Sequence, residues 1–341
     1  MAILYSSLEA MGGKDLISSL KKLRYTAKGH EFMIEQSERP EGPYMVSYFT
    51  LEVEKDLAKL KCLYAIKYAS NSRPYHILVD GDRTGAIAGK NIFPMYPETE
   101  EQINLAPEKI IFTAIQSDPV FSKDTVVQGV GHYMLTFIKN RIFIRLFINK
   151  YSRLITGVEV NRYYTSNFNY VWGDTKRLTL YSFWHMEKNG LHYPFQADIF
   201  VNGRHFRSTT IDSLQLNLPS TIDSLEITDS SFAKMQIMKK MIDPLVEPSL
   251  KPIEISPGIY FVPGNWNTSF VKTENGIYII EAPVSFVYAN TVIREVKKKF
   301  PADKIAGVIS TSDAWPHIGG LRAYAASKIP FYILDINQGI I

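Results

Sequence analysis

Much of the chain before residue 246 alternates apolar or aromatic side chains with polar ones. This period of two is typical of half-buried β-strands. Asn189-Gly190 and Asn202-Gly203 lie between such runs, and an Asn-Gly pair favours a tight hairpin turn. The sequence therefore predicts a curved antiparallel sheet or half-barrel. The clearest runs are 44–49, 64–68, 133–137, 142–148, 154–164, 178–185 and 195–201.

A helical spacing of apolar residues is confined to a few segments of this region. Near the start of the chain it is interrupted by Gly12-Gly13, which predicts two short helices instead of one long helix. A further helix is predicted over 98–116. The apolar positions of the first pair are Leu8, Met11, Leu16, Ile17, Leu20 and Leu23.

The pattern changes after a proline-rich segment at 243–252, which disfavours both helix and central strand. Beyond it, strands alternate with helices, and this order favours parallel pairing. We therefore expect two domains, 1–246 and 253–341. The predicted fold class is α+β, with a curved antiparallel sheet carrying helices, followed by a partial α/β sandwich. One helix of the second domain has Ala289, Val292, Ile293, Val296 and Phe300 on one face.

Composition narrows the function classes. The chain has 341 residues, 45% of them hydrophobic and 13% aromatic, which suits packed cores. Its 38 basic and 34 acidic residues give a net charge of +4, too small a surplus to imply nucleic acid. The single cysteine, Cys62, excludes an internal disulfide framework and a cysteine-rich zinc site. No apolar run approaches the ~18 residues of a membrane-spanning helix.

The segment from Thr311 to Arg322 follows a predicted parallel strand and precedes a helix, where open α/β sheets place their sites. With Pro257–Val262, Asn275-Gly276 and Ile279–Pro283, it resembles the first half of the metallo-β-lactamase fold. That resemblance implies a Thr-His-x-His-x-Asp-His loop whose side chains hold one or two zinc ions. Such ions activate a bound water for hydrolysis.

The loop of this chain departs from that motif. Ser312, Ala314 and Pro316 stand where two of the histidines and the aspartate would be, and only His317 matches a ligand. We therefore do not expect the usual dinuclear zinc site. Because the resemblance covers only half of that fold, we also expect an apolar sheet face that a second copy of the chain would cover as a homodimer.

Two interpretations of the loop remain open. In the functional one, Asp313 and His317 bind a metal, with zinc as the candidate, or act with Glu281 as catalytic acid and base. In the structural one, Asp313 or Ser312 caps the following turn, and His317 hydrogen-bonds to backbone at the helix start. The remaining histidines show no metal-ligand spacing, and we expect structural roles for them.

A second resemblance concerns the amino-terminal region. Helical segments containing Ala10–Gly13 and Leu20–Leu23, followed by a strand at Tyr25–His30, are similar to the lipoprotein-sorting carrier fold. The resemblance implies an apolar cavity for acyl chains and export to a periplasm-like compartment, although Met1–Gly13 lacks the features of a secretory signal. Alternatively, the aromatic inner face is simply packed core.

These observations give two hypotheses for function. The first is a divergent, hydrolase-like protein of the metallo-β-lactamase fold, without the usual dinuclear site and with no cofactor assigned. The alternative is a periplasmic-type binding protein that carries a small, lipid-like ligand in the curved sheet. Neither hypothesis involves nucleic acid or a transmembrane segment.

Overall fold

The computed structural model describes residues 1–37, 39, 41–89, 91–94, 103–163, 174–219, 221–241, 249–264 and 266–338. The chain divides into two compact units. The first comprises Met1–Phe32, Val46–Arg162 and Thr175–Lys239, and the second comprises Met33–Met45, Tyr163–Asp174 and Lys240–Ile341. The domain limits expected at 246 and 253 remain predictions, because 242–248 lie outside the described residues.

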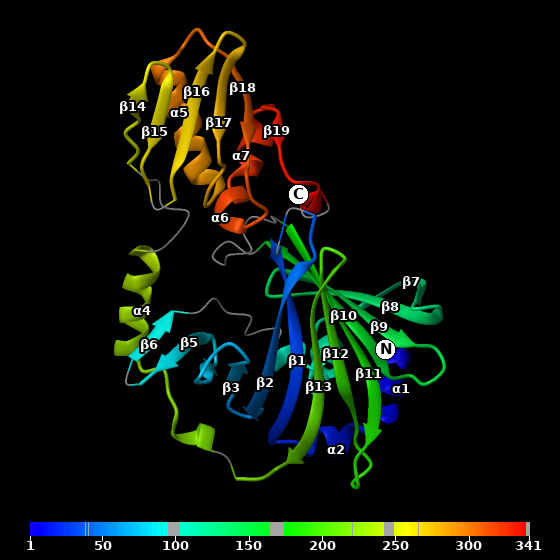
Figure 1. Ribbon diagram of the computed structural model, residues 1–341. Coiled ribbons are helices and arrows are strands. Elements are labelled where there is room, and N and C mark those ends of the chain that lie inside the picture. Colours follow the sequence, from blue (N-terminus) through cyan, green and yellow to red (C-terminus); the bar gives the residue numbers. More distant parts are fainter. Residues whose placement is uncertain are drawn as a thin grey trace. The chain divides into compact units, whose positions relative to one another are not determined.

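A large, curved and open antiparallel sheet dominates the first unit, as the alternation predicts (Figure 1). Its thirteen strands run in the order β6-β5-β4-β3-β2-β1-β13-β12-β11-β10-β9-β8-β7. The strands are β1 (Lys22–Ser37), β2 (Tyr44–Asp56), β3 (Lys61–Tyr68), β4 (Tyr75–Asp80), β5 (Arg83–Ala88), β6 (Asn91–Pro94), β7 (Val120–Val127), β8 (Val130–Lys139), β9 (Ile142–Asn149), β10 (Ile155–Tyr163), β11 (Asp174–Met186), β12 (His192–Val201) and β13 (Arg204–Leu216).

Hairpin turns connect most neighbours in this sheet. The pair Asn202-Gly203 joins β12 to β13 with positive φ angles of 48° and 81°, so this predicted turn is confirmed. The first and last strands of this sheet in sequence, β1 and β13, pair with each other in its middle. In this pairing Leu23 lies opposite Leu216 and Glu31 lies opposite Arg207. This pairing makes one continuous surface of strands far apart in sequence.

The helices of the first unit are short. Two of them, α1 (Ala2–Ala10) and α2 (Lys14–Ser19), are separated by Gly12-Gly13 as predicted, with φ angles of 123° and 89°. Of the helix expected over 98–116, the structure has α3 (Ile110–Gln116), and 98–102 lie outside the described residues. A fourth helix, α4 (Asp229–Met241), follows a 3-10 turn at Thr221–Ser224. No helix among the described residues is long and apolar enough to cross a membrane.

Buried side chains of the first unit form separate clusters. One packs α1, α2 and α3 against strands β8 to β12, and includes Leu4, Leu8, Ile110 and Ile144. Another lies on β1 to β4 and includes Phe49, Leu51, Val53 and Cys62. Tyr25 and Ile211 pack against both clusters and remain only partly buried. The inner face of the sheet therefore has two cores with half-buried side chains between them.

The second unit contains a six-stranded sheet of order β14-β15-β16-β17-β18-β19. Strands β17, β18 and β19 are parallel, as the alternation predicts. The elements are β14 (Ile253–Ser256), β15 (Ile259–Val262), β16 (Thr268–Thr273), β17 (Gly276–Ile280), α5 (Phe286–Lys299), β18 (Ile305–Ile309), α6 (Trp315–Ile318), α7 (Leu321–Ala326), β19 (Phe331–Tyr332) and a 3-10 turn at Asp335–Asn337.

Only one face of this sheet carries the buried side chains. Tyr260 and Phe270 stack at 4.7 Å between ring centroids, and Phe300, at the end of α5, meets both rings edge-on. The predicted amphipathic helix is thus confirmed as α5. The opposite face carries Ile259 and Ile309, each 37% exposed, and Tyr332, 55% exposed. The structure therefore shows one sheet with a bare apolar face, and a two-sheet metallo-β-lactamase sandwich is not confirmed.

Candidate functional sites

A buried ion pair lies between the two cores of the first unit. Lys55 Nζ donates a hydrogen bond of 2.7 Å to Glu108 Oε1, and the two side chains are 4% and 0% exposed. Tyr193 donates its hydroxyl to the other carboxylate oxygen, Oε2, at 3.0 Å. Charges buried in this way are tolerated only when they are paired and hydrogen-bonded. We call Tyr25, Lys55, Glu108, Tyr181 and Tyr193 the inner-face site.

Local structure holds both charges in place. Lys55 has the same strand parity as Leu51 and Val53, so it points to the inner face of β2. Beyond it, Asp56 Oδ1 accepts the backbone N–H groups of Ala58 and Lys59 and closes the turn to β3. Glu108 directly precedes the α3 N-cap, Lys109, whose ammonium donates to the Leu57 carbonyl at 2.6 Å.

Two tyrosines of the site have hydroxyls that lack a hydrogen-bond partner among the described residues. They are Tyr25 on β1 and Tyr181 on β11. Both remain partly accessible. Burial raises the pKa of Tyr25 to about 12, opposed by the charge of Lys55, and burial likewise raises the pKa of Tyr181. Tyr25 and Tyr181 therefore pack against the core of the inner face without being completely buried.

Burial is the main cause of the pKa shifts of the groups around the pair. Burial disfavours the Lys55 ammonium, but the Glu108 carboxylate more than offsets this effect, and the pKa of Lys55 lies above its ordinary value. Burial raises the pKa of the Cys62 thiol to about 12 and that of Tyr64 well above its ordinary value. Cys62 is therefore a buried, protonated thiol with little nucleophilic character.

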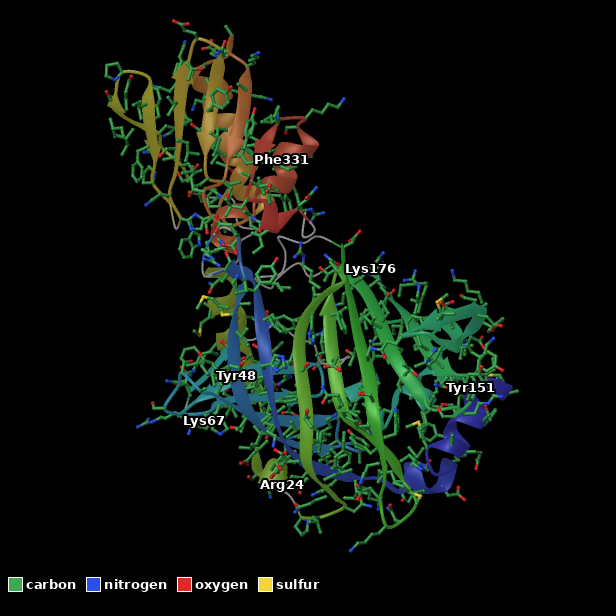
Figure 2. All side chains as sticks on the ribbon, turned by 45° about the vertical axis from the view of Figure 1, so that its right-hand side comes forward. Arg24, Tyr48, Lys67, Tyr151, Lys176 and Phe331 are labelled. Atoms are coloured by element: carbon green, nitrogen blue, oxygen red, sulfur yellow. The ribbon has the colours of Figure 1, made fainter. Side chains whose placement is uncertain are left out.

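A second ion pair lies farther along the same face. Arg207 on β13 pairs with Glu31 on β1, and Tyr68 donates its hydroxyl to Glu31 at 3.0 Å. The Arg207 guanidinium also lies over the Phe49 ring, 5.4 Å from its centroid. The exposed side chains of the same strands, such as Tyr48 on β2, lie on the outer surface (Figure 2). Both cations of the inner face described so far are thus balanced by carboxylates.

The predicted loop residues come together in part. Glu281 follows β17 with a φ of 76°, and its Oε2 lies 2.9 Å from His317 Nδ1. Its Oε1 accepts the Thr311 backbone N–H at 3.2 Å and the Thr311 hydroxyl. We call Glu281, Thr311, Asp313 and His317 the loop site. The His317 ring therefore bonds a carboxylate and not the backbone at the helix start, which was the bond expected in the structural interpretation of the loop.

The other loop residues are held by short-range contacts. Ser312 Oγ accepts the Ala314 backbone N–H at 3.1 Å, so Ser312 caps the turn, which was one of the two residues predicted for this role. Asp313 is 6% exposed, and its Oδ2 has no hydrogen-bond partner among the residues that the structure describes. Within the described part of the chain, no group of three or more His, Cys, Asp and Glu residues is arranged to hold a metal ion. A zinc site on Asp313 and His317 thus lacks a visible third ligand.

Sequence reasoning missed a cluster on the outer face of the large sheet. His205 Nε2 lies 3.0 Å from Ser208 Oγ and 3.7 Å from Asp198 Oδ1. In a catalytic triad, the carboxylate instead orients the ring nitrogen that does not face the serine. Here both partners are at the same nitrogen, so the cluster does not have the geometry of a nucleophilic triad.

The inner-face site was also missed. The signal for Lys55 is present in the sequence, since it continues the apolar alternation of Leu51 and Val53 toward the core. Nothing in the local pattern distinguishes Glu108, which lies 53 residues away and meets Lys55 only in the folded chain. Nothing in the sequence distinguishes Tyr193 from the other 19 tyrosines of the chain.

Comparisons with known proteins give structural similarities only. No family model and no curated protein matches the sequence. A LolA superfamily protein from Nitrosomonas europaea is similar over 66% of this chain and 98% of its own, with 12% identity and a TM-score of 0.45. An outer membrane lipoprotein-sorting protein domain from Vibrio parahaemolyticus covers 70% of this chain and 97% of its own, with 10% identity and a TM-score of 0.38.

The enzyme TMB-1 is similar over 25% of this chain and 43% of its own, with 22% identity and a TM-score of 0.23. All three TM-scores are below 0.5. The roles of the sites are therefore inferred from this chain's own residues.

Proposed function

We propose that the first unit is a binding module that takes a lipid-like ligand against the inner face of its curved sheet. The observation that carries this proposal is the separation of the two cores, with Tyr25 and Ile211 touching both and remaining partly buried. A single packed core would bury such bridging side chains completely. An apolar ligand between the cores would complete that burial.

The composition of this face fits an apolar chain. Leu51, Val53 and Phe49 point inward from β2, and Ala27 from β1, but each is at most 6% exposed. The accessible apolar surface therefore comes from the partly buried Tyr25 and Ile211. Each methylene group that such a surface removes from water contributes about 0.8 kcal/mol to binding. A chain of lipid length therefore gains enough to bind without any charged contact.

The test is native mass spectrometry of the gently purified full chain, with displacement of the apolar dye N-phenyl-1-naphthylamine as a second measurement. We expect a lipid-sized adduct and saturable dye binding. Ile211→Trp should reduce both, because the larger ring occupies the space between the cores. Ile138→Trp, at a position 64% exposed, is the matched control. A protein that binds neither lipid nor dye would contradict the proposal.

The hydrolase hypothesis for the second unit has weaker support. Glu281 and His317 have the contact expected of an acid/base pair, but the second oxygen of Glu281 is already occupied by Thr311. Asp313, His317 and Glu281 remain the candidate catalytic residues, and we assign no reaction to them.

We also propose that a second copy of the chain covers the bare face of the six-stranded sheet. Cross-strand pairing places Phe261, Ser269, Ile280 and Ile309 in one row, and a second row contains Ile259, Val271 and Tyr278. No charged side chain occurs at these positions. Two uncharged apolar faces of this kind stack about 10 Å apart in β-sandwiches. A face without charge suits a second copy of itself better than a charged partner.

Light scattering of the full chain over a range of concentrations tests this pairing. We expect a dimer that dissociates on dilution, and Val271→Asp should make the protein monomeric at all concentrations. Lys298→Asp, on the exposed side of α5, changes the charge in the same direction and should leave the dimer intact. Dimers that persist in Val271→Asp would assign the contact to another surface.

A further inference from the structure

A row of rings crosses the outer face of the large sheet. Its members come from four neighbouring strands, β2, β1, β13 and β12, and none of them is completely buried. The His30 ring lies 6.0 Å from that of Tyr48 on one side and 6.1 Å from that of His205 on the other, between centroids. His205 in turn stacks on Phe200 at 4.9 Å. We call the following set the outer-face row: Tyr48, His30, Phe32, His205 and Phe200.

The outer-face row points away from the cores of the first unit. Tyr48 directly precedes Phe49, which is buried on the inner face. His30 directly precedes Glu31, which pairs with Arg207 on the inner face. Since successive side chains of a strand point to opposite faces, Tyr48 and His30 point outward. Tyr48 is 63% exposed, so the row offers ring surface to a ligand.

The polar atoms beside the rings are mainly acceptors without a donor. Ser208 donates its single hydroxyl proton to Asp198 Oδ1 at 2.5 Å, so its oxygen accepts the Nε2–H of His205 at 3.0 Å. His205 Nδ1 is then an acceptor, and neither it nor Asp198 Oδ2 has a hydrogen-bond partner among the described residues. The His30 ring nitrogens and the Tyr48 hydroxyl likewise have none in the described part of the chain. A ligand for this surface must therefore bring donors.

The charges around the row do not favour an anion. Lys28 lies on the same face of β1 as His30, but its ammonium is paired with Asp212 at 2.8 Å. The Asp198 carboxylate would repel a negative group. The surface thus suits a neutral ligand that has apolar faces for the rings and hydroxyl groups for the acceptors.

We propose that the outer-face row binds a neutral oligosaccharide. A pyranose ring presents C–H groups that stack on aromatic faces, and hydroxyl groups that donate to carboxylate and imidazole acceptors. Three strand spacings give the row a length of about 14 Å, which exceeds one sugar ring, so several rings are covered at once by an oligosaccharide. This site is independent of the lipid-like ligand on the inner face.

Isothermal titration calorimetry of the full chain tests the proposal with three neutral probes, cellohexaose, maltohexaose and N-acetylated chitohexaose. We expect at least one of them to bind, and to bind about tenfold or more tightly than its monosaccharide, because the monosaccharide covers fewer rings. Binding of none of the three hexasaccharides would overturn the proposal. Equal affinity for a hexasaccharide and its monosaccharide would contradict binding along the row.

Variants locate the binding surface. Tyr48→Ala removes the most exposed ring and should weaken binding roughly three- to tenfold. His30→Phe keeps a ring but removes both ring nitrogens, and it should also weaken binding, because hydroxyl donors lose their acceptor. Tyr151→Ala, at a position 83% exposed on the loop after β9, is the matched control and should bind as the wild type does (Figure 2).

The outcomes separate the two faces of the sheet. Unchanged saccharide binding in folded Tyr48→Ala and His30→Phe would place the saccharide elsewhere and overturn the assignment to the outer-face row. An equal loss in Tyr151→Ala would do the same. Binding of N-phenyl-1-naphthylamine should be identical in the wild type and in Tyr48→Ala, so the failure of either proposal leaves the other intact.

Discussion

Lys55 and Glu108 form a buried ion pair of 2.7 Å across the inner face of the large sheet, linking the end of β2 to the segment that precedes α3. The pair fixes the position of α3 relative to the sheet by a contact that neither partner can replace with water. It also brings a permanent charge next to Tyr25 and Tyr181.

Removing one partner should destabilise the first unit strongly. Glu108→Ala leaves the Lys55 ammonium buried and unpaired, and it also removes the acceptor of Tyr193. We expect a loss of about 3–5 kcal/mol in the free energy of unfolding, measured by urea denaturation. Asp212→Ala, which breaks the exposed pair of Lys28 and Asp212, is the control and should cost at most about 1 kcal/mol. Equal effects of the two variants would show that the buried pair has no special role.

High pH should destabilise the fold through the inner-face site. The folded-state pKa of Tyr25 is about 12, above its ordinary 10.0, and that of Lys55 is raised above its ordinary 10.5. Groups with raised pKa values in the folded state stabilise it below the unfolded pKa, and this contribution is lost as pH rises through the folded pKa. We expect the melting temperature to fall between about pH 10 and 12, and to fall less steeply in Tyr25→Phe. A flat profile over this range would be inconsistent with the burial of these groups.

The loop site should not retain zinc. Asp313 and His317 supply two donors, whereas catalytic zinc sites use three protein ligands. We expect well under one zinc per chain by elemental analysis after dialysis against trace zinc. Stoichiometric zinc that disappears in His317→Ala, but not in the control His192→Ala, would refute this prediction and restore the hydrolase hypothesis.

The pairing of β1 with β13 should not tolerate a side chain at Gly29. A Cβ atom there would lie 2.0 Å from the Ser208 carbonyl oxygen and 2.7 Å from the Phe49 ring. We expect Gly29→Ala to cost about 1–3 kcal/mol or more in urea denaturation, because the backbone atom cannot move without breaking the ladder. Gly131→Ala, where the nearest atom is 3.5 Å away, is the matched control and should have a small effect.

Alternation and turn chemistry predicted the antiparallel sheet because they are local signals. Asn202-Gly203 adopts the positive φ angles that its residue types favour, and Gly12-Gly13 separates two helices for the same reason. The parallel strands of the second unit followed from the order of the elements. The inner-face site was not predicted, because its contacts join residues far apart in sequence. Lys55 meets Glu108, and Tyr193 meets Glu108, only in the folded chain.

In the loop site, the sequence identified residues that meet but not all of their contacts. The functional interpretation of the loop placed Glu281 with Asp313 and His317, and Glu281 and His317 do form a hydrogen bond. It did not reveal that Thr311 occupies the other oxygen of Glu281, because the sequence pattern carries no signal for a contact between residues 30 positions apart.

The thirteen-stranded sheet ends at β6 on one side and at β7 on the other, and these two strands do not pair with each other. A closed barrel has a circumference fixed by its strand number and stagger, so its interior accepts ligands of one width. An open sheet with two separate cores can instead change its curvature by small rotations between neighbouring strands while every ladder stays intact. Under the proposed binding function, the same residues could therefore enclose ligands of different thickness, because the sheet would adjust its curvature to each of them.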